Sequence, residues 1–258
     1  MPLFKRVAVA AKLRCIVLLT LVIAWGFGVA VQAGAADYPF LGPAGAPATA
    51  FPKPDRPVAS IISPIWHSEK ERDAARETEQ LVKLLKVISG MTVADIGAGS
   101  GFSTVRLSPI VGPTGRVIAQ DITPAYLKGL VKRVNQLKLK NVTISLGEPH
   151  DPRLPAGSAD LALLIHMYHE ISDPYAFLHN LAPALKPGGR VGIIDARGDT
   201  SKHGTPLALL KCELAAVGYR EIVVHSLKGS DAYLAVFSPP ATNGRPQPAD
   251  IKTCKQDS

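Results

Sequence analysis

The sequence predicts a doubly wound α/β fold with a mostly parallel, seven-stranded sheet that ends in an antiparallel hairpin. Short apolar segments alternate with amphipathic segments, a pattern typical of a parallel sheet covered by helices on both faces. Near the end of the chain, two apolar segments are separated only by Leu227 to Asp231, which indicates a hairpin. A length of 258 residues with 47% hydrophobic content suits one large domain with a full core.

The elements follow from the spacing of apolar residues. We expect strands at Thr92–Ile96, Arg116–Gln120, Val142–Ser145, Leu161–Ile165, Arg190–Asp195, Glu221–His225 and Tyr233–Phe237. We expect helices at Ser68–Ile88, Phe102–Ile110, Pro124–Leu137, Pro174–Ala184 and Thr205–Val217.

A glycine-rich loop follows the first core strand. Glycines at alternate positions let backbone approach a ligand closely, and the helix that follows directs free N–H groups at polar ligand atoms. The common dinucleotide-binding pattern would place its third glycine where this chain has Phe102. The loop predicts a nucleotide-type ligand, with these binding candidates: Asp95, Gly97, Ala98, Gly99 and Gly101.

The second core strand ends in a carboxylate, Asp121, which lies 20 residues beyond Gly101. This interval is usual between a nucleotide loop and the acid that accepts hydrogen bonds from ribose hydroxyls. Asp121 is alternatively the N-cap of the helix that starts near Pro124, and both roles are compatible. We favour ribose binding and include the neighbouring Ile122 in the site.

Four motifs in order resemble class I S-adenosylmethionine-dependent methyltransferases. They are the Gly-x-Gly-x-Gly loop led by Asp95, Gly147-Glu148-Pro149, the stretch Leu154 to Leu161, and Leu185-Lys186-Pro187-Gly188-Gly189-Arg190 followed by Val191 to Asp195. The resemblance covers about Thr92 to Phe237. It implies a Rossmann-like fold, S-adenosylmethionine as cofactor, and methyl transfer to an unidentified small molecule or envelope component.

The same resemblance implies further roles. In the family, an acid after the third strand reads the adenine amino group, which points to Glu148, with Asp151 as a competitor that also suits a turn. A helix at the position of Ser68–Ile88 covers the cofactor pocket in family members, or simply packs on the sheet. The Asn-Pro-Pro-Tyr type signature of amino-methylating members is absent from the sequence, which argues against nucleobase amines as acceptors.

The fourth core strand ends in Ile165-His166-Met167-Tyr168-His169-Glu170, the richest cluster of reactive side chains in the sequence. Either His169 or His166 could take a proton from an acceptor during methyl transfer, because imidazole titrates near neutral pH. Methyl transfer itself requires mainly alignment of the reacting atoms, so no covalent residue is needed. Alternatively these histidines line the cofactor pocket, and we include His166 among the cofactor-binding residues.

Two other functions stay open. A non-catalytic binding module could keep the pocket and lack the chemistry. A nicotinamide-dependent oxidoreductase could use a similar sheet, although Phe102 and the terminal hairpin count against it.

The first 36 residues predict a secretory signal. Four basic residues up to Arg14 precede the apolar run Cys15 to Val31, and small residues follow up to Ala36. We expect cleavage and export to the periplasm; the alternative is an uncleaved anchor at residues 15–31, the only expected membrane contact. Export separates the domain from cytoplasmic S-adenosylmethionine, which supports the binding-module alternative.

The remaining chain divides into a Pro-rich linker at 37–67, a methyltransferase-like domain at 68–238 and a polar tail at 239–258 that we expect to be disordered. The net charge of +8 arises partly from the signal segment, and no basic block interleaves with aromatics. We therefore expect a small-molecule substrate and no nucleic acid. The sequence does not indicate an oligomeric state.

The cysteines and histidines bear on whether the chain holds a disulfide or a metal ion. Cys212 and Cys254 could pair after export, or could stay as two thiols. None of the seven histidines combines with cysteine or carboxylate at metal-ligand spacing along the chain, so we predict no bound metal.

Overall fold

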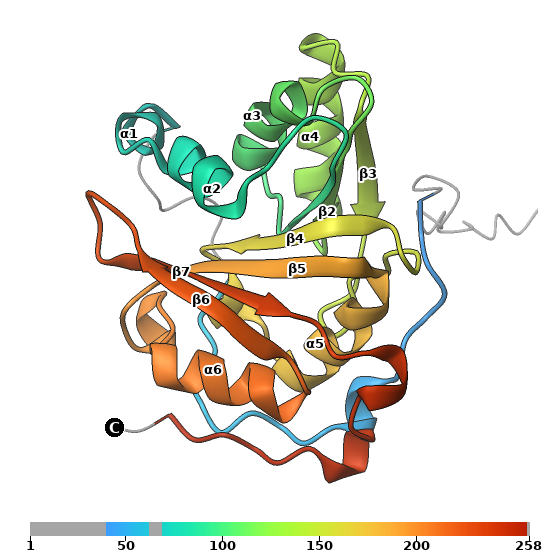
Figure 1. The fold of residues 1–258 in the computed structure, drawn as a ribbon, viewed down its shortest axis with the longest axis vertical. Helices are drawn as coiled ribbons and strands as arrows, with labels where there is room; N and C mark the ends of the chain where they lie inside the picture. The colour runs from blue at the N-terminus through green and yellow to red at the C-terminus, as the bar shows by residue number, and fades with distance from the viewer. Residues whose placement is uncertain (1–39, 62–68, 257–258) are drawn as a thin grey trace, which may run out of the picture. The chain divides into compact units, whose positions relative to one another are not determined.

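The computed structural model describes residues 40–61 and 69–256, which contain a seven-stranded sheet in the order β3-β2-β1-β4-β5-β7-β6 (Figure 1). The strands are β1 (Thr92–Ile96), β2 (Arg116–Asp121), β3 (Val142–Leu146), β4 (Ala159–Ile165), β5 (Leu185–Ala196), β6 (Arg220–Ser226) and β7 (Ala232–Ser238). The strands β1 to β5 pair in parallel, and β7 pairs antiparallel with both β5 and β6. The predicted fold class is confirmed.

Helices cover both faces of the sheet. They are α1 (Glu69–Ala74), α2 (Glu77–Leu85), α3 (Phe102–Val111), α4 (Pro124–Gln136), α5 (Pro174–Leu181) and α6 (Leu207–Ala216). Short 3₁₀ turns lie at Ala48–Ala50, Tyr168–Glu170, Ala182–Ala184, Thr200–Lys202, Thr242–Gly244 and Pro248–Asp250. In Figure 1, α2, α3 and α4 lie on one side of the sheet, and α5 and α6 lie on the other.

The two faces build separate apolar cores because neighbouring strand residues point to opposite sides. Val93 belongs to the core that includes Leu85 of α2 and Leu107 of α3. Ala94, the next residue, belongs to the core that includes Leu181 of α5 and Leu210 of α6. Both faces of the parallel strands are therefore buried, as the all-apolar segments predicted.

The predicted helix Ser68–Ile88 is wrong as a single element. Within its described part, α1 and α2 are separated at Arg76, whose φ of 53° is left-handed. On one continuous helix, Arg72 and Glu77 would point roughly 140° apart. The break instead lets Arg72 Nη2 donate a hydrogen bond to Glu77 Oε1 at 2.6 Å.

The described part of the Pro-rich segment, residues 40–61, packs against the domain as extended chain. Its Phe51 is buried in the core beneath α5 and α6. Arg56 donates from Nε to Glu213 Oε1 at 2.9 Å, and both side chains are fully buried. The Tyr168 hydroxyl donates to the other oxygen of Glu213 at 2.7 Å. A buried charge is stable only when it is paired and hydrogen-bonded in this way, so the segment is fixed to α6.

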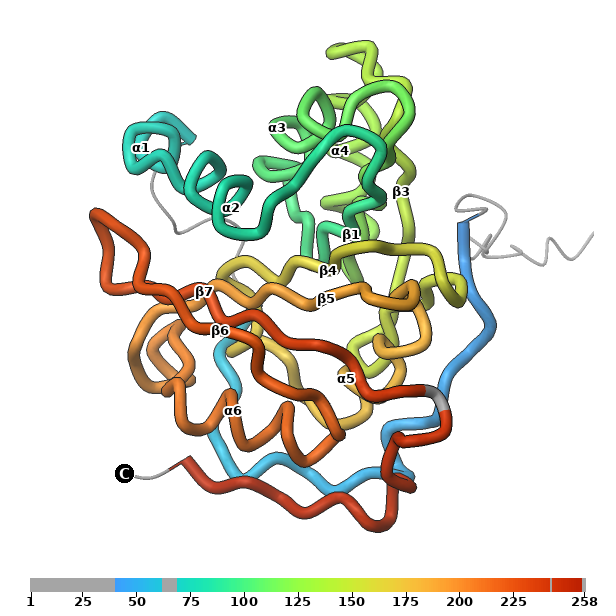
Figure 2. The backbone as a smooth tube through the Cα atoms, viewed as in Figure 1, coloured from blue at the N-terminus to red at the C-terminus, as the bar shows by residue number. Residues whose placement is uncertain are grey.

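The prediction of a disordered tail is wrong for residues 239–256. The tail runs beside residues 40–61 along the α6 side of the sheet (Figure 2), and Asp55 and Lys255 form a β-bridge. A disulfide joins Cys254 to Cys212 of α6, which resolves the question of pairing. The buried side chains of Ile251 and Cys254 supply the apolar contact that the polar composition concealed.

The predicted signal segment, residues 1–36, lies outside the described residues. Among the residues that are described, no helix is both long and apolar enough to cross a membrane.

The disulfide should contribute strongly to stability because it closes a 42-residue separation. We expect the double variant Cys212→Ser/Cys254→Ser to lose about 2–4 kcal/mol of unfolding free energy in urea titrations. Dithiothreitol should lower the urea midpoint of the wild type but not that of the double variant. Equal midpoints for oxidised wild type and double variant would contradict a stabilising cross-link.

Candidate functional site

A pocket of about 400 Å³ lies at the carboxyl ends of β1, β2 and β4. In an open α/β sheet, ligands bind at this edge, where the strand order reverses on either side of the first strand. The walls come from the glycine loop, the residues after β2 and β4, α1, and residues 58–61. The full lining is Val58, Ala59, Ile61, Arg72, Gly97, Ala98, Gly99, Ser100, Phe102, Gln120, Asp121, Ile122, Tyr126, Pro149, Ile165, His166, Met167, Glu170, Ile171, Ser172 and Phe177.

The glycine loop gives the pocket its floor. Gly97 and Gly99 have φ of 67° and 53°, a left-handed conformation that glycine adopts without strain. A Cβ on Gly99 would have no atom within 4 Å, so open space lies above this residue where a ligand can approach the backbone. Gly101 has another role, because a Cβ there would lie 2.2 Å from Leu130 Cδ1 of α4. It permits packing and does not line the pocket.

Asp95 lies beneath the loop and not in the pocket. Its Oδ2 accepts a hydrogen bond from Thr104 Oγ1 of α3 at 2.6 Å, and the carboxyl is buried. Burial raises the pKa of Asp95 to about 6, and nearby Asp121 adds to the rise, although Thr104 and the charge of Arg72 oppose it. Asp95 therefore joins the end of β1 to the start of α3 and positions the loop between them.

Asp121 joins the glycine loop to β2. Its two carboxylate oxygens accept hydrogen bonds from the backbone N–H of Gly99 and of Thr123, both at 2.8 Å. The α4 N-cap position is occupied by Thr123 and not by Asp121. A carboxylate offers about four lone pairs, so each oxygen can still accept from a ligand hydroxyl. Ile122 lines the pocket next to it.

Gln120 contributes a donor that the sequence analysis missed. Gln120 lines the pocket, and its Nε2 is buried and has no hydrogen-bond partner among residues 40–61 and 69–256. A buried amide donor without a partner is costly, so a polar ligand atom at this wall would relieve the cost.

His166 lies in the pocket wall directly after β4. Its φ of 55° is left-handed, which reverses the chain direction as its N–H donates to Ile194 O at 2.8 Å. The ring Nε2 lies 2.7 Å from Glu77 Oε2 of α2. Burial alone would raise the pKa of Glu77, but the hydrogen bond and charge of His166, together with Arg72, lower it to about 2. The carboxylate therefore stays ionised and orients the imidazole.

His169 is fully buried and does not line the pocket. Its Nδ1 lies 2.9 Å and 3.1 Å from the two oxygens of Asp195 at the end of β5. Thr205 Oγ1 donates to the same carboxylate at 2.6 Å. Of the two predicted histidines, the structure brings only His166 to the pocket.

Glu148 also lies away from the pocket. Its carboxylate accepts from Arg153 Nη1 at 2.9 Å on the surface, whereas its neighbour Pro149 lines the pocket. Asp151 is buried and accepts the N–H of Gly45 at 2.7 Å and that of Arg153 at 2.8 Å. It fixes the N-terminal segment and this turn, in agreement with the alternative of a turn-forming residue.

Several residues that line the pocket could not be predicted from the sequence around them. Arg72 comes from α1, where its guanidinium lies 3.7 Å from the centre of the Phe102 ring. Arg106 lies at the same distance from that ring, so Phe102 contacts two cations. The contact of Arg72 depends on the break between α1 and α2, which apolar spacing does not reveal. Gln120 and Met167 adjoin predicted site residues and were within reach of the sequence analysis.

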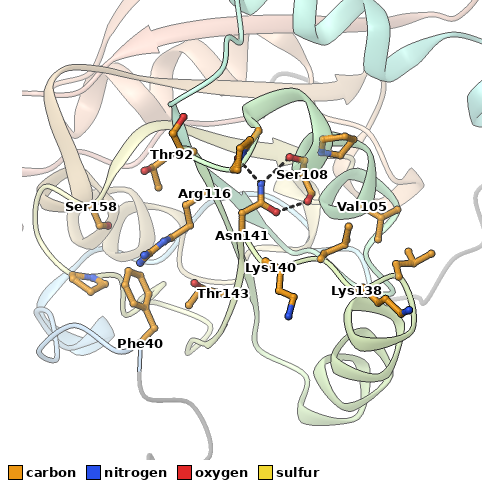
Figure 3. Close-up of a pocket in the computed structure, with 18 residues that line it drawn as sticks. Phe40, Thr92, Val105, Ser108, Arg116, Lys138, Lys140, Asn141, Thr143 and Ser158 are labelled. Atoms are coloured by element: carbon orange, nitrogen blue, oxygen red, sulfur yellow. Dashed lines mark hydrogen bonds between the residues drawn. The ribbon is translucent and has the colours of Figure 1, made fainter.

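A larger hollow of about 980 Å³ lies at the opposite edge of the sheet, near the amino ends of β2 and β3. Figure 3 shows Asn141 bonded to Ser108 across it, with Arg116 and Phe40 at one side and Lys138 and Lys140 at the other. Among the residues labelled in the figure, Asn141 and Ser108 are the pair joined by hydrogen bonds, and these bonds connect the start of β3 to α3. The glycine loop and the histidines lie at the other edge, which identifies the smaller pocket as the functional one.

A family profile described as a methyltransferase domain matches residues 88–233. The chain belongs to this family. It is 29% identical over 114 residues to nocamycin O-methyltransferase of Saccharothrix syringae, across 44% of this chain and 41% of that protein. It is 30% identical over 115 residues to the ubiquinone/menaquinone biosynthesis C-methyltransferase of Saccharophagus degradans, across 44% of this chain and 46% of that protein. The chain therefore spans less than half the length of these relatives.

The solved structure of a SAM-dependent methyltransferase from Aquifex aeolicus superposes with a TM-score of 0.59 at 25% identity, covering 67% of this chain and 98% of that chain. Family and structure together identify S-adenosylmethionine as the cofactor, as the motifs predicted. The pocket fits it, because Gly99 with open space beside it, Asp121 with lone pairs to spare and Gln120 with its buried donor all line one cavity.

We expect Asp121→Ala to weaken binding of S-adenosylhomocysteine at least about tenfold, because the carboxylate would lose its bonds to the ligand and to Gly99. Calorimetric titration of the full chain measures this, with NAD as a second ligand that should not bind. Glu148→Gln is the matched control and should bind as the wild type does, because its side chain pairs with Arg153. An unchanged affinity for Asp121→Ala would remove that residue from the site.

The raised pKa of Asp95 makes stability depend on pH. The folded chain holds the proton of the Asp95 carboxyl more tightly than the unfolded chain does. The contribution of Asp95 to the free energy of unfolding is therefore fully present below about pH 4 and falls as pH rises to about 6. We expect Asp95→Asn to remove this pH-dependent loss of unfolding free energy, which is on the order of 3 kcal/mol at most. Urea midpoints at pH 4 and 7 measure it.

Asp199→Asn is the control for this experiment. Hydrogen bonds from Ser201 lower the pKa of Asp199, so it titrates below this pH window and its replacement should leave the fall intact. An identical pH profile for wild type and Asp95→Asn would show that Asp95 titrates normally.

Proposed function

We propose that this chain transfers the methyl group of S-adenosylmethionine to a small-molecule acceptor. The observation that carries the proposal is the convergence of the glycine loop, Asp121 and the His166–Glu77 pair on one pocket. The relatives named above as an O- and a C-methyltransferase support a small-molecule acceptor.

When bound, the cofactor supplies a methyl carbon on a positively charged sulfur, which needs alignment with the acceptor more than it needs covalent help. Gly97, Gly99 and Asp121 would hold the cofactor, and Gln120 Nε2 would donate to it. Arg72, Phe102 and residues 58–61 complete walls that keep water from the reacting atoms.

His166 is the residue we propose to accept the proton of the acceptor. Because Glu77 holds ring Nε2 at 2.7 Å, we propose Nδ1 as the atom that takes the proton. A carboxylate that stays ionised stabilises the imidazolium that forms, in the manner of histidine–carboxylate pairs in other enzymes. His169 is the weaker candidate, because its ring lies behind the pocket wall against Asp195.

The test of methyl transfer uses S-adenosylmethionine labelled in the methyl group and a panel of small phenols, quinols and thiols. The wild type should move label into an extractable product, and Asp121→Ala should not. Binding of S-adenosylhomocysteine without transfer to any compound of the panel would favour the non-catalytic binding module instead.

With an acceptor in hand, His166→Asn should lower kcat by about 100-fold or more, while the affinity for S-adenosylhomocysteine stays within about threefold. Asparagine is the matched replacement because it tolerates the left-handed backbone at this position. A variant that keeps full kcat would show that His166 only lines the pocket.

We also propose that the chain is exported through its N-terminal segment. The basic, apolar and small residues of positions 1–36 support this, and so does the disulfide, because cross-links of this kind persist in oxidising compartments. Fractionation of a bacterial host should recover the full chain outside the cytoplasm, and deletion of residues 2–31 should retain it inside. Recovery of both forms in the cytoplasm would reject export.

A further inference from the structure

We propose that His169, Glu170 and His203 bind a divalent transition-metal ion, with zinc as the best fit. One ligand atom from each of these residues lies within 4.8 Å of the other two. Ligands of a single zinc ion lie about 3.5 Å apart, so small side-chain rotations bring the three atoms to bonding distance. Two imidazoles and one carboxylate are a ligand set that zinc accepts.

The second observation is the state of the His169 ring. Its Nδ1 faces both oxygens of Asp195, so that nitrogen carries the proton and donates. Its Nε2 is buried and has no hydrogen-bond partner in the described part of the chain. A fully buried imidazole nitrogen with a lone pair and no donor nearby is costly, and a metal ion would satisfy it.

The surroundings of His169 match the outer shell of metal sites. Metal-binding histidines typically donate their other nitrogen to a carboxylate, which fixes the ring and strengthens the ligand. Here Asp195 performs this role, and Thr205 Oγ1 and the N–H of Ala196 hold the carboxylate at 2.6 Å and 2.9 Å. The His203 ring meets the His169 ring edge-on, with 5.3 Å between centres.

The position of the site relates it to the pocket. Glu170 lines the cofactor pocket, so the proposed ion would lie at the wall where an acceptor binds. Three protein ligands leave a coordination position open, as in catalytic zinc sites. Metal binding stands on the contacts above and does not depend on the proposed methyl transfer. Spacing along the sequence concealed the site, because His203 comes from the turn after β5.

The experiment is calorimetric titration of the untagged full chain with zinc after treatment with a chelator. A Cys15→Ser background removes the thiol outside the disulfide. We expect one zinc ion per chain, and a visible absorption band typical of four-coordinate cobalt when Co²⁺ is used instead. Zinc should also raise the melting temperature, because it binds only the folded state.

Glu170→Gln and His203→Ala should each weaken zinc binding at least about tenfold and lose the shift in melting temperature. His225→Ala, which replaces a histidine on β6, is the matched control and should bind zinc as the wild type does. Circular dichroism checks that each variant is folded. If His203→Ala does not fold, the test rests on Glu170→Gln, which keeps the shape of the side chain. Absence of stoichiometric zinc binding, or equal affinity in wild type and Glu170→Gln, would overturn the proposal.

Discussion

Parallel pairing of β1 with both β2 and β4 is the constraint on which the site depends. The register aligns Ile96 with Gln120 on one side and with Leu164 on the other. All three strands therefore end at one edge, and the chain must turn there three times. The glycine loop and His166 directly follow β1 and β4, and Asp121 is the last residue of β2, so the pairing brings them to one edge of the sheet.

Sequence reasoning succeeded where the signal was local. Apolar runs predicted six of the seven strands to within two residues, because burial on both faces of the parallel strands requires uninterrupted apolar sequence, whereas β5 begins five residues before the expected Arg190. Gly97, Gly99 and Asp121 were selected from their spacing along one strand–loop–helix unit, and all three line the pocket, while their contact with the cofactor stays a prediction. The approach failed where the contact was distant. Arg72 reaches the pocket only because the helix breaks at Arg76, and the tail is ordered by a cross-link 42 residues back in the chain.

The two histidines after β4 illustrate how one sequence cluster divides into two environments. His166 leaves the strand with a left-handed backbone, and its ring is hydrogen-bonded to Glu77 of α2. Three residues later, a 3₁₀ turn carries His169 to the other side of this wall, where it meets Asp195. The carboxylate partner of His166 comes from α2 and that of His169 comes from β5, and only His166 lines the pocket. Sequence alone made them equivalent, because both lie in one six-residue cluster.

The terminal segments support the pocket from the back of the domain. Val58 and Ala59 line the pocket, yet the segment that holds them is anchored two residues earlier by the buried Arg56–Glu213 pair. Glu213 follows Cys212 directly, so the disulfide to the tail fixes the same turn of α6 that holds Arg56. The ionic contact and the cross-link thus restrain one pocket wall from behind. Because removal of one partner from a buried ion pair leaves an uncompensated charge, separation of this wall from α6 would be costly.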